Sequence, residues 1–427
     1  MIRIMTYGET PNSEIFLRGL GVVDVSDVVR VIIDDVRANG DRALLSYEER
    51  FDHAHLSSLE VSATEIEAAL AATEPAFLDI LRRAAANIRR FHEQQKRQGF
   101  VLDEANGVML GQKIEPMERV GLYVPGGTAA YPSTVLMDAI PAKIAGCREV
   151  VIVTPPNAEG KINPAILAAA SVAGVDRIFK TGGAQAIAAL AYGTESVPRV
   201  DKIVGPGNAY VAEAKRQVFG TVAIDMIAGP SEVLIVSDGK SDARHLAADM
   251  LAQAEHDKMA TAVLVTDSMA LAHAVQSELE AQLPRLAREE IARASIENNG
   301  KIIVAEDLSA AIEIANEIAP EHLELCVDEP FAYLGAIRHA GSVFLGRNTP
   351  EALGDYLAGP NHTLPTGGTA RFSSPLGVDD FIKKTQFIYY TKDALGAVAE
   401  DIAVFARKEG LTAHAKSAVI RFEEEQS

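Results

Sequence analysis

The sequence predicts an α/β protein with two Rossmann-like parallel-sheet domains, a helical N-terminal region and a helical C-terminal tail. Two successive series of short apolar strands alternate with turns and helices, which is the pattern of βαβ units in a parallel sheet. The chain has 427 residues, of which 48% are hydrophobic. It is therefore too long for one ordinary core and has enough apolar material for two or three domains.

The first 120 residues carry few strand signals. Residues 1–20 have no sustained period and indicate an arm that lies on another part of the protein. Residues 21–120 are predicted to be helical, because VVRVIIDDVRANGD ends at Asn39-Gly40 and FLDILRRAAANIRRFHEQQKRQ repeats apolar residues at helical spacing. We expect this helical region to pack on the second α/β domain.

Two α/β domains and a tail follow. The first domain, residues 121–230, contains the strand and turn segments GLYVPGG, EVVIVTPP, RIFKTGG and VDKIVGPG, with helical segments between them. The second domain, residues 231–370, contains the strands TAVLVTD, KIIVAED, LELCV and GSVFLG. Residues 371–427 form the tail, which begins as a loop-rich stretch and becomes helical from about Asp393.

Composition argues against several classes of function. The formal net charge is −19, with 59 acidic against 40 basic residues, so the chain lacks the basic face that nucleic-acid binding requires. Two cysteines and no signal peptide indicate a reducing cytoplasm. The apolar runs are shorter than the roughly 18 residues of a membrane span. An acidic surface is compatible with a cationic substrate, although many proteins of the cytosol are acidic.

Glycine turns after strands are the candidate cofactor site. They are Gly126-Gly127, Gly182-Gly183 and Gly205-Pro206-Gly207, where backbone N–H groups and helix N-termini could receive a dinucleotide pyrophosphate. None of them matches G-x-G-x-x-G, so tight turns without a ligand are the alternative.

Gln253 and His256 are the first candidate metal ligands. They lie three residues apart at the end of a predicted helix, so an amide oxygen and an imidazole face the same point. A solvated helix end is the alternative, because a metal site needs three or four converging donors.

The other candidate donors are distant in sequence. Glu321 and His322 precede the strand LELCV, where an acid–base pair would be useful, although a Pro-led surface turn is the alternative. Four further polar residues are candidate donors; these are Asp355, His362, Glu409 and His414. The alternative for each is a residue that forms a turn or lies in solvent, without a ligand. Cys147 and Cys326 are interpreted as small core residues.

Eight longer motifs occur in order between Gly121 and His414. They are GLYVPGG, GGAQAIAALAYGT, VDKIVGPGNAYVAEAK, IDMIAGPSE, QAEHD, APEHLEL, LGDYLAGPNHTLPTGGTARF and EGLTAHA. Together they resemble the histidinol dehydrogenase family, zinc enzymes that complete histidine biosynthesis. The resemblance implies oxidation of L-histidinol to L-histidine, through bound L-histidinal, by two successive hydride transfers to NAD.

The resemblance also implies roles for individual residues. One Zn²⁺ per subunit would be held by Gln253, His256, Asp355 and His414. Glu321 and His322 would be the acid–base pair. The substrate contacts would be Ser231 and Glu409, together with His322 and the four zinc ligands. The NAD contacts would be Tyr123, Gln185 and Asn208.

The residue types agree with these implied roles. Two imidazole nitrogens, an amide oxygen and a carboxylate oxygen suit Zn²⁺, with open positions for a substrate. His322 can remove the hydroxyl proton, and Glu321 can activate the water that the second oxidation needs. No thiol is required.

Two other functions are compatible with the sequence. A dehydrogenase of the same superfamily could oxidise another small polar alcohol, such as a sulfonated diol. Glu409 argues against it, since a carboxylate accepts from an imidazole N–H and repels a sulfonate. A non-catalytic nucleotide-binding α/β protein would have lost donor residues, and all of them are present.

The tail predicts an intertwined homodimer with shared active sites. Glu409 and His414 lie in a helical segment that follows a long loop and has no strand of its own to anchor it. In a two-fold dimer such a tail can reach the neighbouring subunit and complete its site, as the resemblance also implies.

Overall fold

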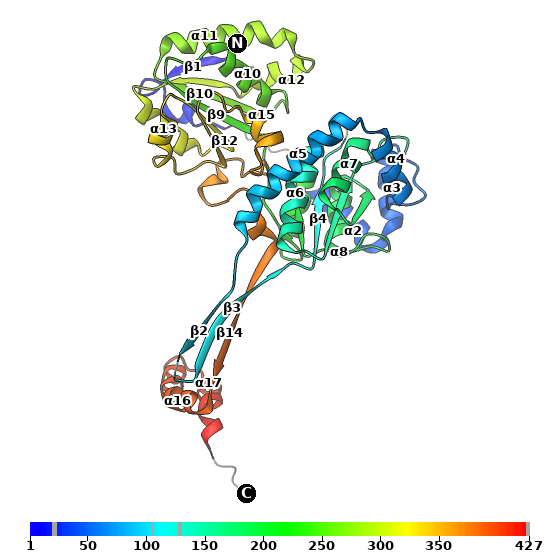
Figure 1. The fold of residues 1–427 in the computed structure, drawn as a ribbon, viewed down its shortest axis with the longest axis vertical. Helices are drawn as coiled ribbons and strands as arrows, with labels where there is room; N and C mark the ends of the chain where they lie inside the picture. Colours follow the sequence, from blue (N-terminus) through cyan, green and yellow to red (C-terminus); the bar gives the residue numbers. More distant parts are fainter. Residues whose placement is uncertain (19–23, 105, 127–129, 424–427) are drawn as a thin grey trace. The chain divides into compact units, whose positions relative to one another are not determined.

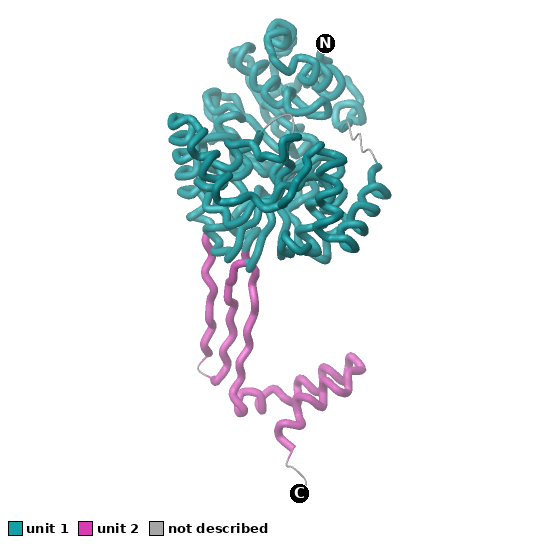
Figure 2. The backbone as a smooth tube through the Cα atoms, turned by 90° about the vertical axis from the view of Figure 1, so that its right-hand side faces the viewer, with its two compact units in different colours: residues 1–95, 117–381 teal, residues 96–116, 382–427 magenta. Residues whose placement is uncertain are grey.

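A computed structural model of the protein describes residues 1–18, 24–104, 106–126 and 130–423. The chain divides into two units (Figure 2): unit 1 contains residues 1–95 and 117–381, and unit 2 contains residues 96–116 and 382–427. Within the described residues, no helix combines the length and the apolar character that crossing a membrane would need.

Unit 1 contains a five-stranded parallel sheet of order β6-β5-β4-β7-β8. Its strands are β4 (Arg119–Tyr123), β5 (Glu149–Thr154), β6 (Arg177–Lys180), β7 (Lys202–Val204) and β8 (Ala223–Ile224). The helices α6 (Pro132–Ala145) and α7 (Pro164–Ala173) share one apolar core with the sheet, and α8 (Gly183–Tyr192) and α9 (Ala209–Val218) share the other. Both faces are therefore covered, which is why these strands are continuous apolar runs.

Unit 1 also contains a six-stranded parallel sheet of order β1-β11-β10-β9-β12-β13. Its strands are β1 (Arg3–Thr6), β9 (Glu232–Ser237), β10 (Thr261–Thr266), β11 (Lys301–Val304), β12 (His322–Cys326) and β13 (Ser342–Leu345). One core holds α10 (Ala243–Ala254), α11 (Met269–Gln282) and α12 (Glu289–Asn298), and the other holds α13 (Leu308–Ile318). The two parallel-sheet domains predicted from the sequence are confirmed (Figure 1).

The N-terminal arm contributes a strand to the six-stranded sheet. β1 pairs in parallel with β11, Arg3 opposite Lys301 and Thr6 opposite Val304, and Figure 1 shows it in blue beside strands from the middle of the chain. The short helix α1 (Asn12–Ile15) follows. The boundary expected at residues 20 and 21 lies outside the described residues.

The helical region packs on the first α/β domain, and the expectation that it packs on the second is wrong. It consists of α2 (Ser26–Asn39), α3 (Asp41–Phe51), α4 (Ala63–Ala72) and α5 (Pro75–His92). Apolar residues of α2 and α3 share a core with α8, and those of α4 and α5 share one with α6 and α7. The reason is that α8 is buried on every side, so its outer face needs a covering layer.

Unit 2 is an antiparallel sheet with two helices. Its strands β2 (Phe100–Glu104), β3 (Val108–Pro116) and β14 (Ile382–Tyr390) lie in the order β14-β3-β2, and α16 (Lys392–Lys408) packs on α17 (Thr412–Val419). Two expectations are therefore wrong: residues 100–104 and 108–116 are strands rather than helix, and the tail has a strand of its own. Both were missed because these strands are largely exposed, so no alternation of buried and solvent-facing residues marks them.

Short elements complete the chain. They are η1 (Glu93–Gln95), η2 (Leu283–Arg285), α14 (Pro330–Leu334), α15 (Glu351–Leu353), the π-helical turn η3 (Gly354–Ala358), η4 (Thr369–Arg371), η5 (Val378–Phe381) and η6 (Ile420–Phe422).

Candidate active site

The candidate catalytic residues lie at the amino ends of two neighbouring strands. β9 and β12 pair in parallel, with His322 opposite Val233. Ser231 directly precedes β9, and Glu321 directly precedes β12. Strand order cannot be read from the sequence, so only the fold shows that these two segments are adjacent.

Glu321 and His322 are both held by the main chain of Glu232. The Glu232 N–H donates to Oε2 of Glu321 at 2.8 Å, and the Glu232 carbonyl oxygen lies 3.1 Å from Nδ1 of His322. The second contact requires a proton on Nδ1, so in the neutral ring Nε2 carries the lone pair. That Nε2 atom is buried and has no hydrogen-bond partner among the described residues.

Burial sets the protonation of this pair. It lowers the pKa of His322 to about 3, so the ring is neutral. Burial also raises the pKa of Glu321 well above its ordinary value, against the Glu232 N–H hydrogen bond, while the charges of Glu232 and Asp355 raise it further. A base next to a carboxyl group of raised pKa is typical of an acid–base site.

A group of donors suited to a cation surrounds His322. Its Nδ1 lies 3.7 Å from Oε1 of Glu351, and its Nε2 lies 3.9 Å from Oδ1 of Asp355. Ligand atoms of these three residues all lie within 4.8 Å of one another. Gln253 is fully buried, and its amide lies between the Glu351 carboxylate and the Glu232 N–H.

These residues fit a divalent cation. Burial raises the pKa of Glu351 and of Asp355, and neighbouring carboxylates raise that of Glu351 further. Within the described chain neither carboxylate forms an ion pair with a lysine or arginine. Crowded carboxylates beside an unpartnered imidazole nitrogen are stabilised by a bound metal ion. Asp355 belongs both to this group and to the ligand set expected from the sequence.

Three histidines converge on the site. Burial lowers the pKa of His322 and of His362, and the neighbouring His256, which follows the end of α10, lowers both pKa values further. His362, which had no role in the sequence analysis, has a buried Nε2 without a partner among the described residues. Its neighbours anchor the loop to α6: Asn361 Nδ2 donates to the Met137 carbonyl at 2.7 Å, and Thr363 Oγ1 donates to Asp138 at 2.8 Å.

Glu351 was not found by sequence reasoning. It begins α15 and lies four residues before Asp355, which belongs to the π-helical turn that begins at Gly354. Its N–H donates to Oε1 of the buried Glu324 at 2.8 Å. The sequence signal that could have indicated Glu351 is its spacing of four residues from Asp355, because that spacing places two carboxylates on one face of a helical segment. The π-helical turn, which is frequent at functional sites, is visible only in the structure.

Glu409 and His414 belong to unit 2. Glu409 follows α16, and His414 lies in α17. The two helices pack through Ala403, Ala406 and Ala415. Both Glu409 and His414 are exposed within this arrangement.

The expected NAD contacts lie at the carboxyl edge of the five-stranded sheet. Tyr123 ends β4, and its hydroxyl accepts from the Gly183 N–H at 3.1 Å. Gln185 is buried in the first turn of α8, and its Nε2 donates to Glu48 at 3.1 Å. Asn208 caps α9 by accepting from the N–H groups of Tyr210 and Val211. Ligands commonly bind at this edge of parallel sheets.

Glu48 is a second residue that the sequence did not indicate. It comes from α3, is fully buried, and also accepts from Thr181 Oγ1 at 2.7 Å. Burial raises its pKa. Nothing in the sequence places α3 against the start of α8.

Packing explains the glycine turns without a ligand. An added Cβ at Gly126 or Gly182 would meet Pro155 at 2.7 and 2.6 Å, and Gly205 has a φ of +112°. Gly127 lies outside the described residues. Gly126 and Gly182 therefore allow close packing against Pro155, and Gly205 allows a left-handed turn. Neither role requires a bound ligand.

The chain is similar along nearly its whole length to proteins of one family. Residues 19–422 match the family model described as histidinol dehydrogenase. The chain is 55% identical to histidinol dehydrogenase of Syntrophotalea carbinolica over 423 residues, 99% of this chain and 96% of that one. It is 56% identical to the Bacillus cereus protein of that name over 397 residues, 93% of this chain and 92% of that one. The crystal structure of histidinol dehydrogenase from Elizabethkingia anophelis superposes with a TM-score of 0.93 at 38% identity, covering 98% of each chain.

Proposed function

Because the chain belongs to the histidinol dehydrogenase family, we propose that it oxidises L-histidinol to L-histidine through bound L-histidinal, with NAD accepting a hydride in each of two steps. The observation that carries the proposal is the buried Glu321–His322 pair, which the main chain of Glu232 holds beside a group of metal-binding side chains.

His322 serves as the base in both oxidations. Its Nδ1 donates to the Glu232 carbonyl, and its Nε2 is free to take the hydroxyl proton as hydride leaves the carbon. Glu321 acts between the two oxidations: its carboxylate takes a proton from the water that adds to the aldehyde. The raised pKa of Glu321 means that its ionised form is a stronger base than an ordinary carboxylate.

The proposed metal ligands are Gln253, His256 and Asp355, with His414 of the partner subunit. A bound Zn²⁺ would supply a positive charge that holds electron-rich atoms of the substrate. The Glu351 carboxylate contacts the Gln253 amide and adds negative charge beside these ligands.

NAD and substrate are assigned to separate sets of residues. Tyr123, Gln185 and Asn208 are the proposed NAD contacts, and support comes from their common position at the carboxyl edge of the sheet. Ser231 and Glu409 are proposed to bind substrate, with Glu409 accepting from the imidazole N–H. The acidic character of the chain, at a net charge of −19, is compatible with a cationic amino alcohol.

We further propose a homodimer, because unit 2 has almost no core of its own. Its buried apolar cluster contains three alanines. Large apolar side chains on its strands and helices are exposed instead; they include Phe100, Val101, Leu102, Ile388, Tyr389, Val404 and Phe405. Many exposed large apolar side chains on one small unit are typical of a surface that a partner covers.

The test is the stoichiometry of NADH. Purified protein, limiting histidinol and excess NAD should give about two NADH per histidinol, with no free aldehyde, because one site performs both oxidations. One NADH with accumulating aldehyde, or oxidation of a sulfonated diol in preference to histidinol, would overturn the proposal.

A further inference from the structure

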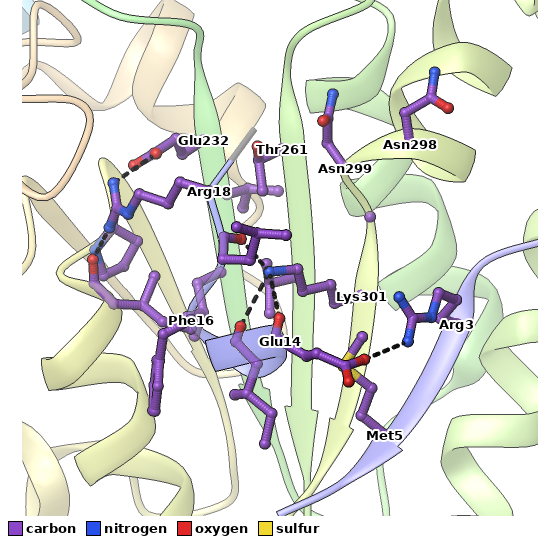
Figure 3. Close-up of a pocket in the computed structure, with 18 of the residues that line it drawn as sticks. Arg3, Met5, Glu14, Phe16, Arg18, Glu232, Thr261, Asn298, Asn299 and Lys301 are labelled. Atoms are coloured by element: carbon purple, nitrogen blue, oxygen red, sulfur yellow. Dashed lines mark hydrogen bonds and ion pairs between the residues drawn. The ribbon is translucent and has the colours of Figure 1, made fainter. Parts of the chain in front are cut away.

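Glu232 connects the catalytic pair to the N-terminal arm. Its main-chain atoms contact Glu321 and His322, as described above. Its side chain leaves the strand toward a pocket on the arm (Figure 3), where Oε1 accepts from Arg18 Nη1 at 2.8 Å. One residue at the start of β9 therefore joins two catalytic side chains to a cation that precedes it by 214 positions.

Arg18 is itself held in place. Its second guanidinium nitrogen donates to the carbonyl oxygen of Ile318, the last residue of α13. The guanidinium also lies beside Gly368, where an added Cβ would come within 3.2 Å of Nη2. Gly368 has a φ of +80° and lies in the glycine pair of LPTGGTARF, so the absence of a side chain there leaves room for Arg18.

Lys301 anchors the arm that carries Arg18. It begins β11, and its Nζ donates to the carbonyl oxygens of three arm residues, Glu14, Ile15 and Leu17. Burial lowers the pKa of this ammonium group. The arm is thus attached by backbone contacts, and Arg18 is the arm side chain that contacts Glu232 (Figure 3).

The Arg18–Glu232 ion pair is partly buried, so its removal should disturb the neighbouring residues more than removal of a surface ion pair would. The two side chains are 24% and 13% exposed. Burial raises the pKa of the Glu232 carboxyl group, and the charge of Arg18 lowers it. Removing one partner of a buried pair leaves the other charge uncompensated, so the remaining group moves or loses its charge.

We propose that Arg18 is a positioning residue for the oxidation, because it fixes the Glu232 side chain and, through it, the main-chain N–H and carbonyl that orient Glu321 and His322. The inference rests on the proposed function, which assigns proton transfers to those two residues. Arg18 touches neither of them directly and has no catalytic role of its own.

Arg18→Gln should lower kcat about 10- to 100-fold in both oxidations, since a small displacement of reacting groups slows a reaction by that order. KM for NAD and zinc content should change little, whereas the thermal unfolding midpoint should fall, because the Glu232 carboxylate loses its partner. Each half-reaction is measured by single turnover, starting from histidinol or from histidinal. Arg18→Lys keeps the charge without the forked contact and should recover part of the rate.

Arg3→Gln is the matched control. Arg3 lies on the same arm and pairs with Glu14 at 2.9 Å, but its side chain is 64% exposed and forms no hydrogen bond or ion pair with β9 in the described chain. It should retain the kcat of the unmodified protein.

A double variant separates positioning from a general effect on folding. If Arg18 acts through Glu232, Arg18→Gln combined with Glu232→Gln should be no slower than the slower single variant. Additive losses, or a normal kcat for Arg18→Gln, would overturn the inference.

An unmodified protein that fails to form two NADH would instead refute the proposed function, so the two failures are distinguishable. Should Arg18→Gln not fold, a fully active Arg18→Lys would also contradict the forked contact.

Discussion

At the residue scale, the division of labour between Glu321 and His322 is open to direct test. Glu321→Gln should leave the first hydride transfer unchanged and slow the second about 10²- to 10⁴-fold, because only the second oxidation uses an activated water. Single-turnover measurements of each half-reaction give the two rates. Glu317→Gln, which removes the exposed carboxylate at the end of α13, is the matched control. Equal slowing of both steps would count against this assignment.

His256 supplies a second test at this scale. Its replacement by alanine should weaken metal binding at least about 100-fold and abolish activity while the fold remains, because a zinc site loses much of its affinity with each ligand. Elemental analysis of the dialysed protein measures the metal. His245→Ala changes an exposed histidine of α10, the helix that precedes His256, and should keep its zinc. Near-normal zinc in His256→Ala would refute the ligand assignment.

At the scale of elements, the contact of α3 with α8 should make stability depend on pH. Burial raises the pKa of Glu48 above its ordinary value of 4.5. A raised pKa in the folded state means that the protonated form is stabilising: the contribution is complete below 4.5 and is lost as the pH rises through the folded-state pKa. The free energy of unfolding should therefore fall between about pH 5 and about pH 8.

Glu48→Gln should remove this part of the pH dependence, because a neutral amide keeps the acceptor for Thr181 and Gln185 and does not titrate. Urea unfolding at the two pH values measures the difference. Glu49→Gln, at the exposed neighbouring position, should behave like the unmodified protein. An identical pH slope in Glu48→Gln would show that Glu48 is ionised in the folded state.

At the scale of the whole molecule, shared active sites predict complementation between inactive variants. His256→Ala and His414→Asn are unfolded and refolded together in equal amounts. Half of the dimers should be mixed, and each mixed dimer holds one intact site, so about a quarter of all sites should recover. Either variant refolded alone should stay inactive. Mixed dimers detected by mass without activity would mean that His414 serves its own subunit or binds no metal.

The sequence by itself determined the two parallel sheets and the family. Largely buried strands such as β5 and β10 are apolar runs rich in β-branched residues, and their alternation with helices admits few other folds. Motif residues such as Gln253, His322 and Asp355 were also identifiable, because their neighbours in sequence carry a distinctive pattern.

Only the tertiary structure decided which elements touch. β1 joins the second sheet, the helical region covers the first domain, and exposed strands form unit 2, although the local sequence of each indicates none of this. Glu48, Glu351 and Glu232 gain their importance from partners elsewhere in the fold. Arg18 and Glu232 stand 214 residues apart, and a contact at that separation leaves no periodic signal in the chain, because it arises only when packing brings the two segments together.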